Sequence, residues 1–328
     1  MENYFGWKTG KDKKYGFKII SLRYKDANNP LHNLEVQITP SIGCNLCKFT
    51  VGSDDVIRYA GDTLFKSGSS GNPILYPTPN RVRGCSFDFN GITYKLVKKG
   101  KNRYIHGLVY DEEWKYDLPL IQEDCVVLKT WIDFSEESPM YQAFPFKHRL
   151  IVEFRLYEMG IKLIYSVENY DDKNLPFGFA LHPFFEKLSG DNGTYITIPA
   201  DYVMESTPDC LPTGKVIKVG KTRFDIRKPK AVGELDIDHN YIGMKSGLSS
   251  TINYENKLFY LSLDTSDDFT HLVLFTPQGE RFFCLENQTC STDAHNLYSK
   301  GYQKESGLII VSPGYAHKGY VMYSVHFK

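Results

Sequence analysis

The sequence of 328 residues has neither long apolar segments nor an excess of charge of either sign. No apolar run approaches the ~20 residues that span a bilayer, and Met1 to Lys8 lack the apolar core of a secretory signal. Lysine and arginine total 39, and so do aspartate and glutamate. A nucleic-acid-binding surface usually carries net positive charge, which displaces the counterions of the phosphates. These absences predict a soluble cytoplasmic protein that contacts neither a membrane nor nucleic acid.

Cysteine patterns for disulfides or metal sites are also missing. The seven cysteines are an odd number, spread from Cys44 to Cys290, and they predict no disulfide framework. Cys44 and Cys47 have the spacing of metal ligands, but a structural zinc site needs four ligands and no second CxxC or HxxxH pair supplies them. We therefore expect no bound metal, and two buried thiols near a turn.

Helical periodicity is nearly absent, and neither a fixed-period repeat nor a Pro/Ser-rich linker divides the chain. One short helix is expected within 291–300. Alternation of apolar and polar residues predicts strands in the rest of the chain. The predicted strands include 150–157, 161–167, 195–198, 258–263, 272–275, 281–286, 308–312 and 320–327.

Two pairs of these strands are predicted to form antiparallel hairpins. The alternation that begins at Leu150 resumes after the short turn 158–160. Asn90-Gly91 joins a second pair and suits a type I′ turn, because both central residues of that turn need positive φ. The aromatic content of 14% fits strands, although aromatic rings also stack on ligands. The pattern predicts one all-β antiparallel domain over 1–328, either a sandwich or a barrel.

Two polar residues inside apolar segments are candidates for chemistry. Glu286 shares a predicted strand face with Phe282 and Cys284, where a carboxylate is costly unless it is paired or used. It either ends the strand and turns to solvent, or acts as a general base whose pKa burial raises towards neutrality. His182 precedes Pro183, which favours extended geometry. Its ring has apolar neighbours, so it is either a hydrogen-bonded structural residue or a functional one.

Three further polar residues each allow two interpretations. His106 precedes Gly107, which permits a close backbone approach. Asp238 lies in a predicted loop, where aspartate usually caps turns. Arg81 comes just before the Asn-Gly hairpin and is compatible with a surface ion pair. Taken singly, these residues do not decide a function.

Taken in chain order, five segments resemble motifs of the aldose 1-epimerase (galactose mutarotase) family. They are 80–84 (NRVRG), 105–108 (IHGL, followed by Trp114), 181–185 (LHPFF), 238–241 (DHNY) and 285–296 (LENQTCSTDAHN). The family usually has two glycines where this chain has Gly107-Leu108, and commonly proline where Asn287 stands. The resemblance implies a large antiparallel β-sandwich that holds a sugar in a concave face, in agreement with the strand periodicity.

The resemblance also implies an activity and the roles of the residues. The activity is that of an isomerase, which interconverts the α and β anomers of a free aldohexose and needs no cofactor. Glu286 would be the base at the C1 hydroxyl and His182 the acid at the ring oxygen, O5. The residues that would hold ring hydroxyls are Arg81, His106 and Asp238. Trp114 would be a lid or stacking residue, the partner a small monosaccharide, and the assembly a monomer or weak homodimer.

Three alternatives remain open from the sequence. A hexose-6-phosphate mutarotase would place a phosphate against basic side chains, for which the candidates are Arg83, Lys101 and Arg103. A glycoside hydrolase would use Glu286 and Asp238 as its two carboxyl groups, leaving His182 without a role. A non-catalytic carbohydrate-binding β-sandwich would hold sugar through aromatic rings and Asp238.

Overall fold

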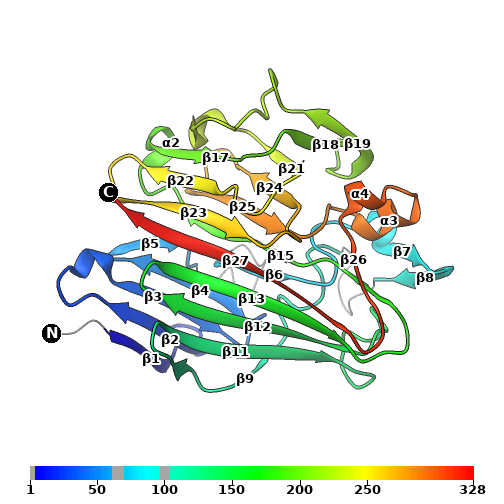
Figure 1. The fold of residues 1–328 in the computed structure, drawn as a ribbon, viewed down its shortest axis with the longest axis horizontal. Helices are drawn as coiled ribbons and strands as arrows, with labels where there is room; N and C mark the ends of the chain where they lie inside the picture. Colours follow the sequence, from blue (N-terminus) through cyan, green and yellow to red (C-terminus); the bar gives the residue numbers. More distant parts are fainter. Residues whose placement is uncertain (1–3, 61–69, 97–103) are drawn as a thin grey trace.

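A computed structural model describes residues 4–60, 70–96 and 104–328, which form two large antiparallel sheets and a few short helices (Figure 1). The larger sheet has 13 strands and the smaller sheet has 10. The larger sheet consists of β1 (Tyr4–Lys11), β2 (Lys18–Lys25), β3 (Leu34–Thr39), β4 (Asn45–Val51), β5 (Asp54–Ile57), β6 (Ile74–Leu75), β15 (Ala180–Leu181), β16 (Phe184–Glu186), β18 (Tyr202–Ser206), β19 (Pro212–Lys218), β21 (Asp238–Ile242), β24 (His271–Phe275) and β25 (Phe282–Gln288).

The smaller sheet and the remaining elements complete the chain. The smaller sheet consists of β9 (Lys115–Tyr116), β10 (Leu120–Ile121), β11 (Cys125–Phe134), β12 (His148–Tyr157), β13 (Gly160–Asn169), β17 (Thr194–Thr197), β20 (Lys230–Ala231), β22 (Ser250–Tyr254), β23 (Phe259–Thr265) and β27 (Ala316–Phe327). Two separate strand pairs are β7 (Ser86–Phe89) with β8 (Ile92–Lys95), and β14 (Leu175–Phe177) with β26 (Ile309–Val311). The helices are α2 (Gly190–Gly193), α3 (Ala294–Ser299) and α4 (Gln303–Ser306), with 3₁₀ turns η1 (Pro30–His32), η2 (Arg83–Cys85) and η3 (Val232–Glu234).

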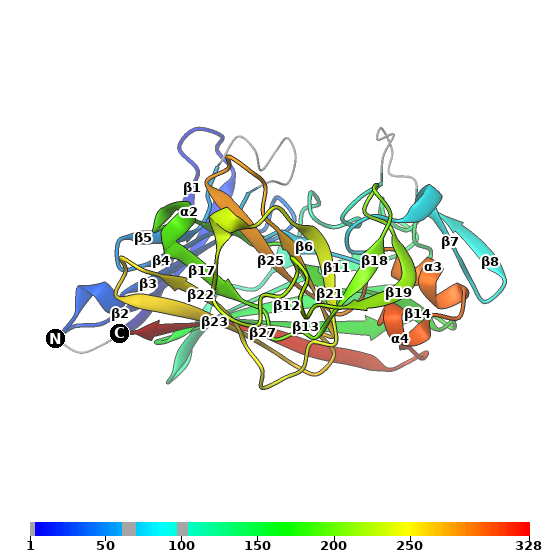
Figure 2. The ribbon, with the colours of Figure 1, turned by 90° about the horizontal axis from the view of Figure 1, so that it is seen from above.

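One hydrophobic core connects the two large sheets, whose stacking is visible in Figure 2. Alternate residues of β12 are buried in this core, beginning at Leu150, and the same alternation continues in β13. Rings from the two sheets meet where Phe185 of β16 lies 5.8 Å from Tyr323 of β27, measured between ring centroids. The predicted antiparallel β-sandwich is therefore confirmed, and its core is built by the period-two pattern of the sequence.

The predicted hairpins are both present. Strands β12 and β13 pair from Tyr157 opposite Gly160 to His148 opposite Asn169. The turn between β7 and β8 has positive φ at Asn90 (51°) and Gly91 (78°), as a type I′ turn requires. Helix α3 lies within the predicted helical segment and beside β7, near α4 (Figure 1).

The expectation of a loop at Asp238 is wrong. Strand β21 begins at this residue, where Asp238 pairs with Phe275 of β24. Pairing with a neighbouring strand that lies far along the chain overrides the local turn preference of aspartate. The expected pair of buried thiols is confirmed, with Cys44 in the turn before β4 and Cys47 within β4.

Strand β25 lies near the middle of the larger sheet and is buried along its whole length. Phe283 and Leu285 point into the core between the sheets. Phe282 and Cys284 point to the opposite face, where they pack with Phe184 of β16. This second face of the larger sheet is thus apolar as well, and it carries the cavity described below. No helix among the described residues is long and apolar enough to cross a membrane.

Several histidines are buried in the β framework. Each donates a ring N–H to a backbone carbonyl, namely His148 to Phe146 (2.7 Å), His271 to Glu305 (3.1 Å) and His295 to Pro176 (3.2 Å). Burial lowers the pKa of His148 to about 3, and lowers the pKa values of His271 and His295 to about 4. The folded protein therefore keeps these rings neutral at pH values where an unfolded chain protonates them.

We expect the free energy of unfolding to fall as the pH drops from 6.5 towards 4. Below the unfolded pKa of ~6.5 only the unfolded state takes up these protons, so each neutral histidine contributes a loss of about 1.4 kcal/mol per pH unit. In His148→Gln, which keeps a donor for the Phe146 carbonyl, the slope between pH 6 and 5 should be shallower by about that amount. Urea denaturation at a series of pH values measures it, and an unchanged slope would contradict the assignment.

Candidate active site

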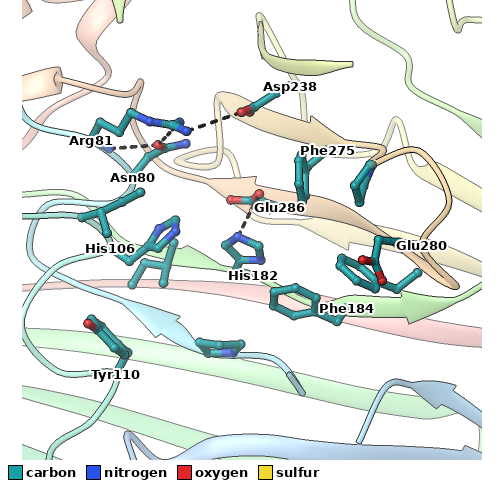
Figure 3. A pocket seen from close by; sticks show the side chains of 15 residues that line it. Asn80, Arg81, His106, Tyr110, His182, Phe184, Asp238, Phe275, Glu280 and Glu286 are labelled. Atoms are coloured by element: carbon teal, nitrogen blue, oxygen red, sulfur yellow. Dashed lines mark hydrogen bonds and ion pairs between the residues drawn. The ribbon is translucent and has the colours of Figure 1, made fainter. Parts of the chain in front are cut away.

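A cavity of about 360 Å³ opens on the outer face of the larger sheet (Figure 3). Its lining divides into a polar and an apolar set. The polar residues are Asn80, Arg81, His106, Tyr110, His182, Asp238, Glu280 and Glu286. The apolar residues are Pro73, Leu75, Ile105, Phe184, Phe275, Pro277 and Phe282. The polar groups come from segments far apart in the sequence, as a binding site on a β framework requires.

The centre of the cavity is a contact between a carboxyl group and an imidazole. Nε2 of His182 lies 3.3 Å from Oε1 of Glu286, and both side chains are almost completely buried. Glu286 is on β25, and His182 lies between β15 and β16, where its backbone N–H donates to the carbonyl of Pro73 (3.0 Å). The His182 ring stacks on Phe184, with centroids 4.8 Å apart. Backbone pairing and ring stacking therefore fix both partners.

Burial shifts the two groups in opposite directions. Desolvation raises the pKa of Glu286 well above its usual value, and the nearby charge of Asp238 raises it further. Desolvation lowers the pKa of His182 to about 4. Both shifts favour the arrangement in which one proton is on the carboxyl group and the imidazole is neutral, and transfer of that proton across the contact gives the ion pair. Such a pair exchanges a proton across one short contact without changing its net charge.

A second polar pair lies beside the first. Nη2 of Arg81 lies 3.5 Å from Oδ2 of Asp238, and both groups are partly exposed to the cavity. Oδ1 of Asn80 accepts hydrogen bonds from the backbone N–H of Arg81 (2.9 Å) and from its Nη1 (3.1 Å). The guanidinium is therefore oriented from two sides before any ligand arrives.

His106 reaches the cavity through unusual backbone geometry. Its φ is +67°, and Gly107 has φ +79°. A Cβ atom on Gly107 would lie 2.2 Å from the carbonyl oxygen of Tyr76, so only glycine fits there. The His106 ring stands perpendicular to that of His182, with centroids 5.0 Å apart. Burial is the main cause that holds the pKa of His106 well below its usual value, and the charges of His182 and Arg81 lower it further.

The segment after β25 holds the loop that carries Arg81. The backbone N–H of Asp293 donates to the carbonyl of Arg81 (3.0 Å), and Oδ1 of Asp293 accepts from the backbone N–H of Arg83 (2.9 Å). Nδ2 of Asn296 donates to the same oxygen (2.7 Å). Asp293 is buried and adopts a left-handed conformation, with φ +57°. The sequence motif included Asp293, but nothing in the sequence assigned it this contact.

Five of the six residues predicted from the sequence line the cavity, namely Arg81, His106, His182, Asp238 and Glu286. Trp114 does not. It is 2% exposed within the hydrophobic core, and its indole N–H donates to the carbonyl of Val109 (3.3 Å). The expectation that Trp114 is a lid or stacking residue is therefore wrong, because a ring held inside the core cannot cover a ligand.

Of the cations considered for a phosphate, Arg83 lies outside the cavity lining and contacts Asp293 (3.5 Å). Lys101 and Arg103 lie outside the described residues. The sequence analysis assigned no site role to the other lining residues, which are Pro73, Leu75, Asn80, Ile105, Tyr110, Phe184, Phe275, Pro277, Glu280 and Phe282. Three of them, Asn80, Ile105 and Phe184, stand inside the quoted motifs, and Phe282 shares the predicted strand face of Glu286. These positions were the available signal, and the remaining residues carried none.

Solved structures of other proteins share this fold. A galactose mutarotase-like protein from Clostridium acetobutylicum matches with a TM-score of 0.85 at 20% sequence identity, covering 100% of this chain and 99% of that chain. Galactose 1-epimerase from Lactobacillus acidophilus NCFM matches with a TM-score of 0.75 at 17% identity, covering 99% of this chain and 98% of that chain. The protein therefore has the galactose mutarotase-like fold.

Sequence comparison identifies the family. The family model of aldose 1-epimerase matches residues 26–324. Galactose mutarotase from Sus scrofa is 28% identical over 175 residues, which cover 49% of this chain and 48% of that protein. The chain thus spans about half the length of the curated relatives that it matches. The chain belongs to the aldose 1-epimerase family.

Asp293→Ala should destabilise the protein by roughly 1–3 kcal/mol, because the backbone N–H of Arg83 and the amide of Asn296 lose a buried acceptor. Asp293→Asn is the matched control. It keeps an acceptor oxygen and tolerates the left-handed backbone, so it should lose much less stability. Chemical denaturation of the two variants measures the difference. Equal losses would show that the charge of Asp293, and not its accepting oxygen, holds the loop.

Proposed function

We propose that the protein is an aldose 1-epimerase, a carbohydrate isomerase that interconverts the α and β anomers of a free aldohexose. The observation that carries this proposal is the buried 3.3 Å contact between Glu286 and His182, in a cavity that Arg81, His106 and Asp238 also line. Family membership supports the same reaction class. An acid and a base in contact are what ring opening of a cyclic sugar needs.

In the proposed mechanism, Glu286 as the carboxylate removes the proton of the C1 hydroxyl while His182 as the imidazolium protonates O5. The C1–O5 bond breaks and the free aldehyde forms. After rotation about C1–C2, the ring closes on the other face of the carbonyl, and the two groups reverse their roles. The proton is on His182 before ring opening and on Glu286 after it. The pair therefore holds one proton throughout, and no net charge builds up in the buried site.

The remaining polar groups would fix the sugar. Arg81 presents charged donors, and Asp238 presents charged acceptors. The neutral ring of His106 can donate one hydrogen bond and accept another. Charged partners orient hydroxyl groups more strongly than neutral ones do. The aromatic rings of Phe184 and Phe282 form an apolar wall beside the acid–base pair, and such a wall excludes water and fits the C–H face of a sugar.

The charges of the cavity favour a neutral sugar over a phosphorylated one. Three carboxyl groups line it, those of Asp238, Glu280 and Glu286, whereas Arg81 is its one permanently charged cation among the described residues. Arg81 already contacts Asp238. A phosphate dianion would meet the negative charge of Glu280 and would find no unpaired cation in the described lining. The acid–base contact also gives His182 a role, which the glycoside hydrolase alternative does not.

Glu286→Gln and His182→Asn should each remain folded and slow mutarotation by ~10²–10⁴-fold, because each removes one of the two proton-transferring groups. Polarimetry of freshly dissolved α-galactose or α-glucose follows the reaction. The matched control is Glu186→Gln, which removes a partly buried carboxyl group from β16 outside the cavity lining and should keep the parent rate. Near-parental rates in either site variant would refute the assignment of the pair.

A panel of free and phosphorylated sugars tests the substrate class. We expect acceleration of mutarotation for free glucose or galactose, and at least a tenfold lower kcat/KM for glucose 6-phosphate because of the carboxylates that line the cavity. Higher activity with the phosphorylated sugar would reverse this conclusion. Saturable sugar binding without any acceleration would instead favour the non-catalytic carbohydrate-binding module.

A further inference from the structure

Gln288 contacts the Glu286 carboxyl group from outside the cavity lining. Both residues are on β25, two positions apart, so their side chains lie on the same face of the strand. Nε2 of Gln288 donates a hydrogen bond to Oε2 of Glu286 (3.1 Å), while His182 contacts the other oxygen, Oε1. Gln288 is 0% exposed and does not line the cavity. It therefore contacts the carboxyl group without being placed to contact a sugar.

Burying this amide costs free energy, and the packing of the strand does not require an amide at this position. Oε1 of Gln288 is buried and has no hydrogen-bond partner among the described residues. A buried acceptor without a partner costs about 1–3 kcal/mol. The backbone of Gln288 pairs with His271 of β24 and Ala180 of β15, and an apolar side chain would keep that pairing. Among the described residues, the bond to Glu286 is therefore the one hydrogen bond that the amide makes.

We propose that Gln288 is a positioning residue, which holds Oε2 of Glu286 so that Oε1 faces His182 and the cavity. This inference rests on the proposed function, in which Glu286 is the base. A carboxyl group fixed at one oxygen cannot rotate away from its proton-transfer partner, and positioned geometry contributes directly to rate. The N–H donor also favours the carboxylate over the protonated acid, which opposes the effect of burial.

Other titratable and charged groups lie around Glu286, and a substitution at Gln288 alters none of these residues. Asp238 raises the pKa of Glu286 and Arg81 lowers it. His182 lies against Oε1, with His106 beyond it. Cys284 shares the strand face, and His271 lies across from Gln288 on β24. A change in the titration of Glu286 in a variant with an uncharged residue at position 288 therefore reports the lost hydrogen bond.

Gln288→Met and Gln288→Glu test the proposal. Methionine has a similar length and no donor, and glutamate has the same shape but adds a second carboxyl group. In both variants the titration midpoint of Glu286 should rise, by about one pH unit for methionine, since a hydrogen bond to a charged group is lost or a like charge is added. Infrared difference spectra against the same protein with Glu286→Gln report the C=O band of protonated Glu286 as a function of pH, whether or not the protein is catalytic.

The kinetic consequence is separate from the titration. The acidic limb of kcat/KM should move to higher pH in both variants, and kcat should fall roughly tenfold or more in Gln288→Met while KM stays within about twofold. Cys284→Ala is the control, because Cys284 stands two residues before Glu286 on the same face and outside the cavity lining. It should leave the titration midpoint and the acidic limb unchanged.

Three results would overturn the role of Gln288. They are an unchanged Glu286 midpoint in folded variants, a loss of thermal stability with a parental pH profile, and a rise in KM at constant kcat. If the parent protein shows no mutarotation of any sugar, the proposed function fails, and the infrared titration still decides whether Gln288 holds the carboxyl group.

Discussion

The burial of Glu286 against His182 is the constraint that organises the outer face of the larger sheet. A lone carboxylate or a lone imidazolium would cost several kcal/mol to remove from water. One proton shared across a 3.3 Å contact leaves the pair without net charge, so burial becomes tolerable. A shared proton of this kind requires that both side chains are fixed in position and that water is excluded. A strand near the middle of the sheet and an aromatic wall on one side supply these two conditions.

Charges also cancel in pairs in the rest of the cavity. Arg81 and Asp238 form a second pair whose charges cancel, and Asn80 and Asp293 fix the backbone that carries the arginine. The cavity is therefore lined by many polar groups, but its net charge is close to zero apart from the exposed carboxylate of Glu280. A surface of this kind distinguishes ligands by the directions of their hydroxyl groups, because it exerts little net attraction on charge.

Much of the fold could be predicted from the sequence, because two-residue periodicity fixes which side chains of β12 and β13 are buried and Asn90-Gly91 fixes a turn. Five residues of the cavity could be predicted because short motifs preserve their chemistry in order along the chain. What could not be predicted depends on pairing across long sequence separations. Asp238 is in a strand because β24 lies beside it, and the interior position of Trp114 depends on the packing of the core. The contacts of Asp293 with the Arg81 loop likewise exist only in the folded chain.

The interior position of Trp114 has a practical consequence. The cavity lining contains no tryptophan among the described residues, and Trp114 is enclosed by the core. Its indole emission is therefore placed to report on the integrity of the β-sandwich and is poorly placed to sense a bound sugar. If tryptophan emission does not change on addition of a monosaccharide, that result therefore carries no information on affinity. Calorimetry or the optical rotation of the sugar is the appropriate measurement.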